Sequence, residues 1–280
     1  MIRTLLVRGM VVGVIAGLLT FGVAKIFGEP QVDRAIAFEE QMDKAKEEKA
    51  AQQMLNSVTG STTSSGNMST AGSGNMAGMN MSNAEAAEPE LVSRAVQSGI
   101  GLFTGVVVYG TAFGGLFALV FAYAYGRMGN LSPRATAALL AGAAFLALVI
   151  VPDIKYPANP PAVGNPDTIG ERTGFFLVMI LATIAAMIIA GKIARHMAEQ
   201  LGGWNAALLG GVIFVTLVVI VQLLLPVINE VPEGFPATVL WRFRITSIGI
   251  EAILWTTIGL VFGALAEKVL VRGRWSPAYA

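Results

Sequence analysis

The sequence has no cysteine and a single histidine, His196, among its 280 residues. The absence of cysteine excludes disulfides, thiolate metal sites and cysteine nucleophiles. Charge is also scarce, because Asp, Glu, Lys and Arg together make up 13% of the chain, about half the share that is usual in soluble domains. Since 54% of the residues are apolar, the composition indicates an integral membrane protein and leaves no room for a large soluble enzyme domain.

Sequence motifs of enzymes are missing as well. The chain contains no G-x-x-x-x-G-K-[ST] phosphate loop, no H-E-x-x-H and no G-x-S-x-G, so neither nucleotide hydrolysis nor a familiar hydrolase mechanism is indicated. No basic stripe accompanies the net charge of +1, which argues against nucleic acid as a partner. We therefore expect neither an enzyme nor a tightly bound cofactor.

Six apolar runs are each long enough for a helix across a hydrocarbon core, which takes about 20 residues. The sequence thus predicts an all-α membrane protein with six transmembrane helices, over residues 9–27, 99–125, 135–151, 174–194, 204–228 and 245–265. Small residues recur every fourth position in these runs, as in Gly13 and Gly17, Gly110 and Gly114, and Gly259 and Gly263. Such spacing predicts faces where helix backbones approach closely.

The predicted organisation has four parts. Residues 1–27 hold a cytoplasmic N-terminus and the first span, and 28–98 form an extracytoplasmic segment. Charge alternation predicts a surface helix at about 32–55 within that segment. A partly disordered Met/Ser/Gly loop of low complexity is expected at about 57–83. Residues 99–270 carry five further spans, and 271–280 are a cytoplasmic tail.

Basic residues set the predicted orientation. In the six-span topology nine of them fall on one side, namely Arg3, Arg8, Arg127, Arg134, Lys192, Arg195, Lys268, Arg272 and Arg274. The short loops of the other side carry only Lys155, Arg172, Arg242 and Arg244. The positive-inside rule therefore places both termini in the cytoplasm. The same topology puts 15 of the 18 acidic residues on the outer face, where they would concentrate cations.

Glu251 is the only charged residue within the last apolar run. An ionisable residue in a transmembrane segment marks an ion path, a proton relay or a buried polar pair. Glu251 and Gln222 are predicted at a similar depth, roughly 9 Å below the outer surface, on neighbouring antiparallel helices. They are candidate metal ligands, although a structural hydrogen bond of Glu251 to Gln222, Ser247 or Thr246 explains this carboxylate equally well.

Acidic and amide side chains near the outer surface are further candidates. The loop at 153–172 is rich in proline, so its backbone is stiff and its carbonyl groups are free to face an ion. It is read either as an ion vestibule or as a rigid connector. The candidate ligands are Asp153, Asn159, Asp167 and Glu171 in this loop, with Glu29, Asp33 and Glu39 after the first span.

Methionines in the first outer loop form another group. Met76, Met79 and Met81 lie within six residues, and thioethers are soft ligands that suit Cu(I) better than harder divalent ions. The group is read either as a metal-capture site or as a linker in which methionine is incidental.

Several loop sequences resemble the CbtA family of bacterial cobalt transporter subunits. The resemblance is carried by GEPQVDRAI at 28–36, VSR at 92–94 with Gln97, YPANPPAVG at 156–164 with PDT at 166–168, and NEVP at 229–232 with FPATVLWRFR at 235–244. It covers nearly the whole chain apart from about residues 40–88.

The resemblance implies a multi-pass subunit of a cobalt uptake system in the bacterial plasma membrane, serving cobalamin synthesis, with cobalt(II) as the transported ion. It also implies a small one-helix partner of the CbtB type whose histidine-rich end would supply the imidazoles that this chain lacks. A homo-oligomer is left open. Two alternatives remain: a copper(I)-handling membrane protein that uses the methionine loop, and a membrane scaffold that transports nothing itself.

Overall fold

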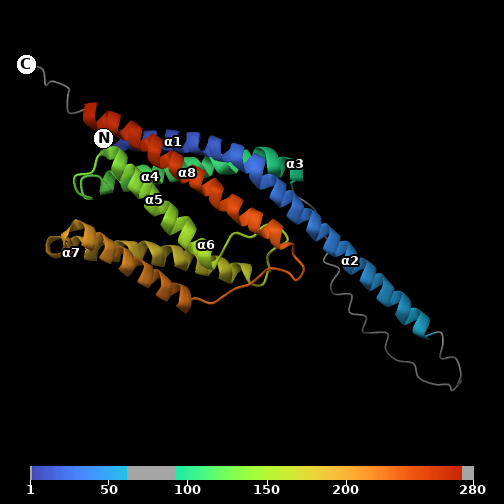
Figure 1. Ribbon diagram of the computed structural model, residues 1–280. Coiled ribbons are helices and arrows are strands. Elements are labelled where there is room, and N and C mark those ends of the chain that lie inside the picture. Colours follow the sequence, from blue (N-terminus) through green and yellow to red (C-terminus); the bar gives the residue numbers. More distant parts are fainter. Residues whose placement is uncertain (1, 62–91, 273–280) are drawn as a thin grey trace, which may run out of the picture.

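The computed structural model describes residues 2–61 and 92–272, and all regular structure in these residues is helical (Figure 1). The predicted all-α class is therefore confirmed. The elements in chain order are α1 (Ile2–Val23), the π-helical η1 (Ala24–Gly28), α2 (Glu29–Ser61), α3 (Arg94–Val96), the π-helical η2 (Gln97–Gly101), α4 (Leu102–Ala124), α5 (Pro133–Phe145), the π-helical η3 (Leu146–Ile150), α6 (Val151–Lys155), α7 (Ile169–Leu224) and α8 (Ala237–Arg272).

Five helices among the described residues are long and apolar enough to cross a membrane, when elements that continue into one another are counted as one helix. The predicted number of six is thus not confirmed. These helices are Ile2–Asn56, Arg94–Ala124, Pro133–Lys155, Ile169–Leu224 and Ala237–Leu270.

The difference in number arises in α7, which contains both the fourth and the fifth predicted span. Its backbone leaves the helical region at Gly202, where φ is 75° and ψ is 157°, a conformation that is essentially restricted to glycine. The two halves then pack on each other, because a Cβ on Gly210 would lie 2.9 Å from Cβ of Ala194 and 3.4 Å from the carbonyl oxygen of Ala190. The element is therefore a helical hairpin that turns at Gly202 (Figure 1).

Glycines bring α1 and α4 into backbone contact. A Cβ on Gly13 would lie 2.1 Å from the carbonyl oxygen of Gly110, and a Cβ on Gly9 would lie 2.3 Å from that of Gly114. Residue numbers rise along α1 as they fall along α4, so the helices are antiparallel. Because only hydrogen fits between these backbones, the small-residue spacing acts here as the predicted packing face.

A second close contact joins α5 to α8. Gly259 faces the side chain of Ala141, and Gly263 faces Ala137 and the backbone of Arg134. α8 also packs on α1, where Arg8 Nη1 donates to the carbonyl oxygen of Leu265 at 2.7 Å.

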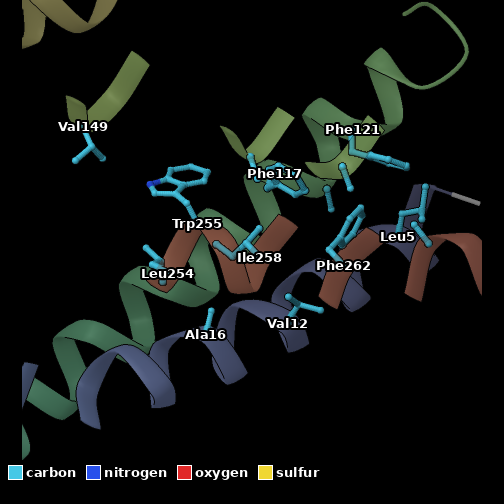
Figure 2. Packing of buried hydrophobic residues seen from close by; sticks show 14 residues of the cluster. Leu5, Val12, Ala16, Phe117, Phe121, Val149, Leu254, Trp255, Ile258 and Phe262 are labelled. Atoms are coloured by element: carbon cyan, nitrogen blue, oxygen red, sulfur yellow. The ribbon is translucent and has the colours of Figure 1, made fainter. Parts of the chain in front are cut away.

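The main apolar core lies where α1, α4, α5 and α8 meet. Its aromatic side chains pack edge to face: the ring of Phe262 lies 5.4 Å from that of Phe117 and 5.1 Å from that of Phe121. Trp255 packs in the same way on Phe113, at 5.8 Å. Figure 2 shows Trp255, Phe117 and Phe262 in this cluster, above Val12 of α1. The core fixes the part of α8 that carries Glu251.

α2 continues from α1 through η1 and extends past the other helices (Figure 1). It includes residues 32–55, for which a surface helix is predicted. Most of the predicted low-complexity loop at about 57–83 lies outside the described residues. The inner end of α2 is packed, since Ala35 is buried beside Phe235 and Val163.

Gly110→Val should destabilise the protein more than Gly105→Val. Both glycines are in α4, but a Cβ at Gly110 would lie 2.6 Å from the carbonyl oxygen of Gly13, whereas a Cβ at Gly105 meets nothing within 4 Å. We expect Gly110→Val to cost on the order of 1–3 kcal/mol or more, as overpacking does, and Gly105→Val to cost much less. The measurement is the thermal midpoint of each detergent-solubilised variant, with the folded fraction after heating read by size-exclusion chromatography. Equal midpoints would show that the backbone contact is not required.

Candidate functional site

Glu230 is a buried carboxylate in the loop between α7 and α8, and its side chain is 2% exposed. Thr168 Oγ1 donates to its Oε1 at 2.8 Å, and Asn159 Nδ2 donates to its Oε2 at 3.3 Å. The guanidinium of Arg172 forms an ion pair with it at 3.4 Å. These three partners come from the proline-rich loop and the first turn of α7, so Glu230 ties three chain segments together.

Two arginines, one from α7 and one from α8, donate hydrogen bonds to the proline-rich loop. Arg244 of α8 donates through Nε to the carbonyl oxygen of Ala158 at 3.3 Å and through Nη2 to Asn159 Oδ1 at 3.0 Å. Arg172 of α7 donates to the carbonyl oxygen of Pro157. The carbonyl groups of Pro157 and Ala158 are thus bound by guanidinium groups of the chain itself, and the reading of the loop as an ion vestibule stays a prediction.

Asp153 lies in the middle of the short helix α6, at the start of the proline-rich loop. It lines a cavity of about 230 Å³ together with Tyr156, Arg172 and Phe176, and its charge interacts with those of Arg172 and Arg244. Tyr156 is 2% exposed, and its hydroxyl donates to the carbonyl oxygen of Pro226 at 2.8 Å. The cavity therefore holds one half-buried carboxylate beside two positive charges.

Glu251 lies deeper along α8, beside Tyr109 of α4 and Trp255 of its own helix. Its Oε2 is buried without a hydrogen-bond partner among the described residues, and so is the indole nitrogen of Trp255. The hydroxyl of Thr20 on α1 is also buried without a hydrogen-bond partner among the described residues. Buried polar atoms without partners are rare in native structures and call for an explanation, such as a bound ion or water.

Gln222 does not pair with Glu251. Its Nε2 donates to the carbonyl oxygen of Val151 at 3.3 Å, because the hairpin α7 packs on η3 and α6, whereas α8 packs on α1 and α5. The prediction that the last two spans are neighbours is therefore wrong, and Gln222 and Glu251 do not share a site on that ground. Gln222 joins the hairpin to α6 instead.

The acidic residues after the first span are divided. Glu29 and Asp33 at the start of α2 both pair with Arg94, at 2.6 Å and 3.0 Å, so this arginine occupies two of the candidate ligands. Glu39 is exposed further along α2.

The remaining candidates are not brought into one site either. Asp167 and Glu171 are exposed near the start of α7. Met76, Met79 and Met81 lie outside the described residues. Within 2–61 and 92–272, no group of three or more His, Asp or Glu side chains could hold a metal ion.

Glu230, Arg172 and Arg244 are not among the candidate ligands predicted from the sequence. Glu230 lies in the NEVP run that carries the resemblance, and a single carboxylate between apolar and proline residues could have marked it. Arg172 and Arg244 were counted only for orientation. Their pairing could not be predicted, because it depends on how the loop folds over the ends of α7 and α8.

The chain matches the model of one known protein family. The family model described as probable cobalt transporter subunit (CbtA) matches residues 2–267, which is nearly the whole chain. The chain belongs to the CbtA family. The resemblance seen in the loops is thereby confirmed, and it makes the protein a membrane-embedded subunit of a cobalt transporter. No curated protein and no solved structure matches the chain.

The CbtA family is named for transport and not for catalysis, in agreement with the lack of enzyme motifs. The family match gives no individual residue a role. The network around Glu230 and the buried carboxylate of Glu251 are therefore described as candidate sites on the basis of their geometry alone.

Arg172→Gln should destabilise the protein, because it leaves the buried carboxylate of Glu230 without its ion pair. We expect a loss of about 1–3 kcal/mol, the usual cost of an unsatisfied buried group. The double variant Arg172→Gln/Glu230→Gln should recover part of this loss, because the amide carries no buried charge.

Thermal midpoints of the two single variants and the double variant measure this coupling, and Glu233→Gln in the same loop is the control, because Glu233 is exposed. Strictly additive effects of the two substitutions would show that the pair does not interact.

Proposed function

We propose that this CbtA-family chain takes up cobalt(II) across the plasma membrane, in support of cobalamin synthesis, and that both of its termini are cytoplasmic. The family match supports cobalt as the ion. The observation that carries the proposed path is the buried Oε2 of Glu251, which has no hydrogen-bond partner among the described residues. The half-buried carboxylate of Asp153, in a cavity beside the proline-rich loop, would precede it on the path.

The entrance of the path is the loop that covers Asp153. An arriving ion would meet Glu230, Asn159 and the loop carbonyl groups, which are hard oxygen ligands that a hydrated divalent ion can exchange for water. The guanidinium groups of Arg172 and Arg244 occupy these ligands in the structure. We infer that they are resident cations, which keep the acidic groups neutralised while no metal is present and must be displaced when metal enters.

Glu251 would be the second ion-binding site on the path. A carboxylate at this depth is costly unless it is protonated or paired, and its buried oxygen lacks a partner in the described residues. A dehydrated divalent ion would supply that partner. Thr20 and Tyr109 are placed on the facing helices α1 and α4, where their hydroxyl oxygens could serve as additional ligands.

A partner subunit would complete the transporter. This chain has one histidine, which is exposed in α7 six residues before the turn at Gly202. Because imidazole is a common ligand of cobalt-like ions, we infer that a small one-helix subunit of the CbtB type brings the imidazoles. The energy source would also have to come from an ion gradient or another subunit.

Glu251→Gln should reduce cobalt uptake to near background while the protein remains in the membrane, because the amide cannot carry the negative charge that binds the ion. The measurement is accumulation of radioactive cobalt in cells without other cobalt uptake that express the chain with its small partner. Glu199→Gln is the matched control, since Glu199 is an exposed glutamate of α7. Normal uptake by Glu251→Gln at equal protein level would give Glu251 a structural role.

Two alternatives to cobalt uptake are separated by further measurements. If the methionine loop serves copper, deletion of residues 66–82 should change copper tolerance and leave cobalt accumulation unchanged. If the chain is a scaffold, proteoliposomes that contain it with its partner should move no cobalt.

A further inference from the structure

A groove of about 380 Å³ lies where η1 and the start of α2 pass the first turns of α8. Phe27, Gln31 and Arg34 line it from the first two elements, and Trp241 and Arg242 line it from α8. Figure 1 shows that the N-terminal end of α8 lies beside the junction of α1 and α2. The groove is separate from the carboxylates of the proposed ion path, none of which lines it.

The groove carries two positive charges and no carboxylate among its lining residues. Arg34 donates through Nη1 to Gln31 Oε1 at 2.9 Å, which holds its guanidinium at the groove while leaving other N–H groups free. Arg242 has no hydrogen bond or ion pair with any described residue. By contrast, Arg94 and Arg172 have carboxylate partners. The two groove arginines thus lack the anion that their geometry favours.

The surroundings of the groove combine apolar and polar surface, as at the boundary between hydrocarbon and water. Trp241 is 67% exposed, Phe27 58% and Ile26 65%. Exposed aromatic side chains at the end of a transmembrane helix are typical of the membrane interface. A ligand at this position meets both acyl chains and water, which favours a lipid over a soluble molecule.

We propose that this groove binds the headgroup phosphate of an anionic phospholipid. Arg34 and Arg242 contact the phosphate, since guanidinium groups match its oxygens through pairs of hydrogen bonds. Phe27 and Trp241 lie against the glycerol and the upper acyl chain. The lipid holds the η1 junction to the start of α8, and a headgroup with net negative charge is preferred because the groove has no acidic residue.

Native mass spectrometry of the purified full-length protein tests the proposal. The protein in detergent is titrated with phosphatidylglycerol, with phosphatidylcholine or with inorganic phosphate. We expect a specific phosphatidylglycerol adduct that raises the thermal midpoint, weaker binding of phosphatidylcholine, and no effect of millimolar phosphate. The double variant Arg34→Gln/Arg242→Gln should bind phosphatidylglycerol about 30-fold more weakly, because each basic residue beside an anionic lipid contributes on the order of fivefold.

The control Lys192→Gln/Arg195→Gln removes the same charge from exposed residues of α7 and should leave the adduct unchanged. Arg34→Lys/Arg242→Lys should retain part of the binding, which separates loss of the site from misfolding. Equal phosphatidylglycerol binding by the Gln variant and the wild-type protein would overturn the proposal. So would equal affinity for phosphatidylcholine, or a thermal shift with inorganic phosphate alone, because the groove would then bind either any lipid or a soluble anion.

Discussion

The close approach of α1 and α4 is the contact on which the arrangement of the other helices depends. In a bilayer the helices gain nothing by hiding apolar side chains from lipid, so their association rests on close packing. Gly9 and Gly13 meet Gly114 and Gly110 with only hydrogen atoms between the backbones. This pair presents a joint surface to α8, and α8 in turn receives α5 through Gly259. The glycines therefore determine where the core is and at which point Glu251 faces Tyr109.

The hairpin α7 is attached to this body in a different way. Its halves pack on each other, but it joins the other helices chiefly through η3 and α6 and through the proline-rich loop. Polar contacts are prominent there: Gln222 with Val151, Tyr156 with Pro226, and Arg172 with Glu230. A seam held by hydrogen bonds and ion pairs can exchange its partners for water or ions more readily than one held by interlocked glycines. Asp153 lies on this seam, which is why the proposed ion path follows it.

The sequence analysis correctly predicts the helical class and the small-residue packing faces, because both depend on local composition or on residues four apart. The family resemblance was visible in the loops for the same reason. The pairing of Gln222 with Glu251 was not correctly predicted, since an apolar run says nothing about its neighbours in the bundle. The turn at Gly202 lies between two predicted spans. The helix continues on both sides of this turn, so the two spans form one element, α7. Glu230 was overlooked because its burial arises only when the ends of α7 and α8 meet the loop.

Glu230 and Glu251 show two opposite ways of keeping a carboxylate away from water. Glu230 has three donors, one of them charged, and these offset much of its desolvation cost. A carboxylate with this many partners stabilises the folded state. If one partner is removed, the desolvation cost of the buried carboxylate is no longer offset, and the protein loses stability. Glu251 lies beside Tyr109 and Trp255, but one of its carboxylate oxygens is buried without a hydrogen-bond partner among the described residues, so its desolvation cost is less fully offset than that of Glu230. The same reasoning applies to the partnerless hydroxyl of Thr20. The unsatisfied groups are therefore the reason for proposing an ion site in the interior of the α1, α4 and α8 bundle, and the paired groups around Glu230 are the reason for proposing that an ion has to open the proline-rich loop.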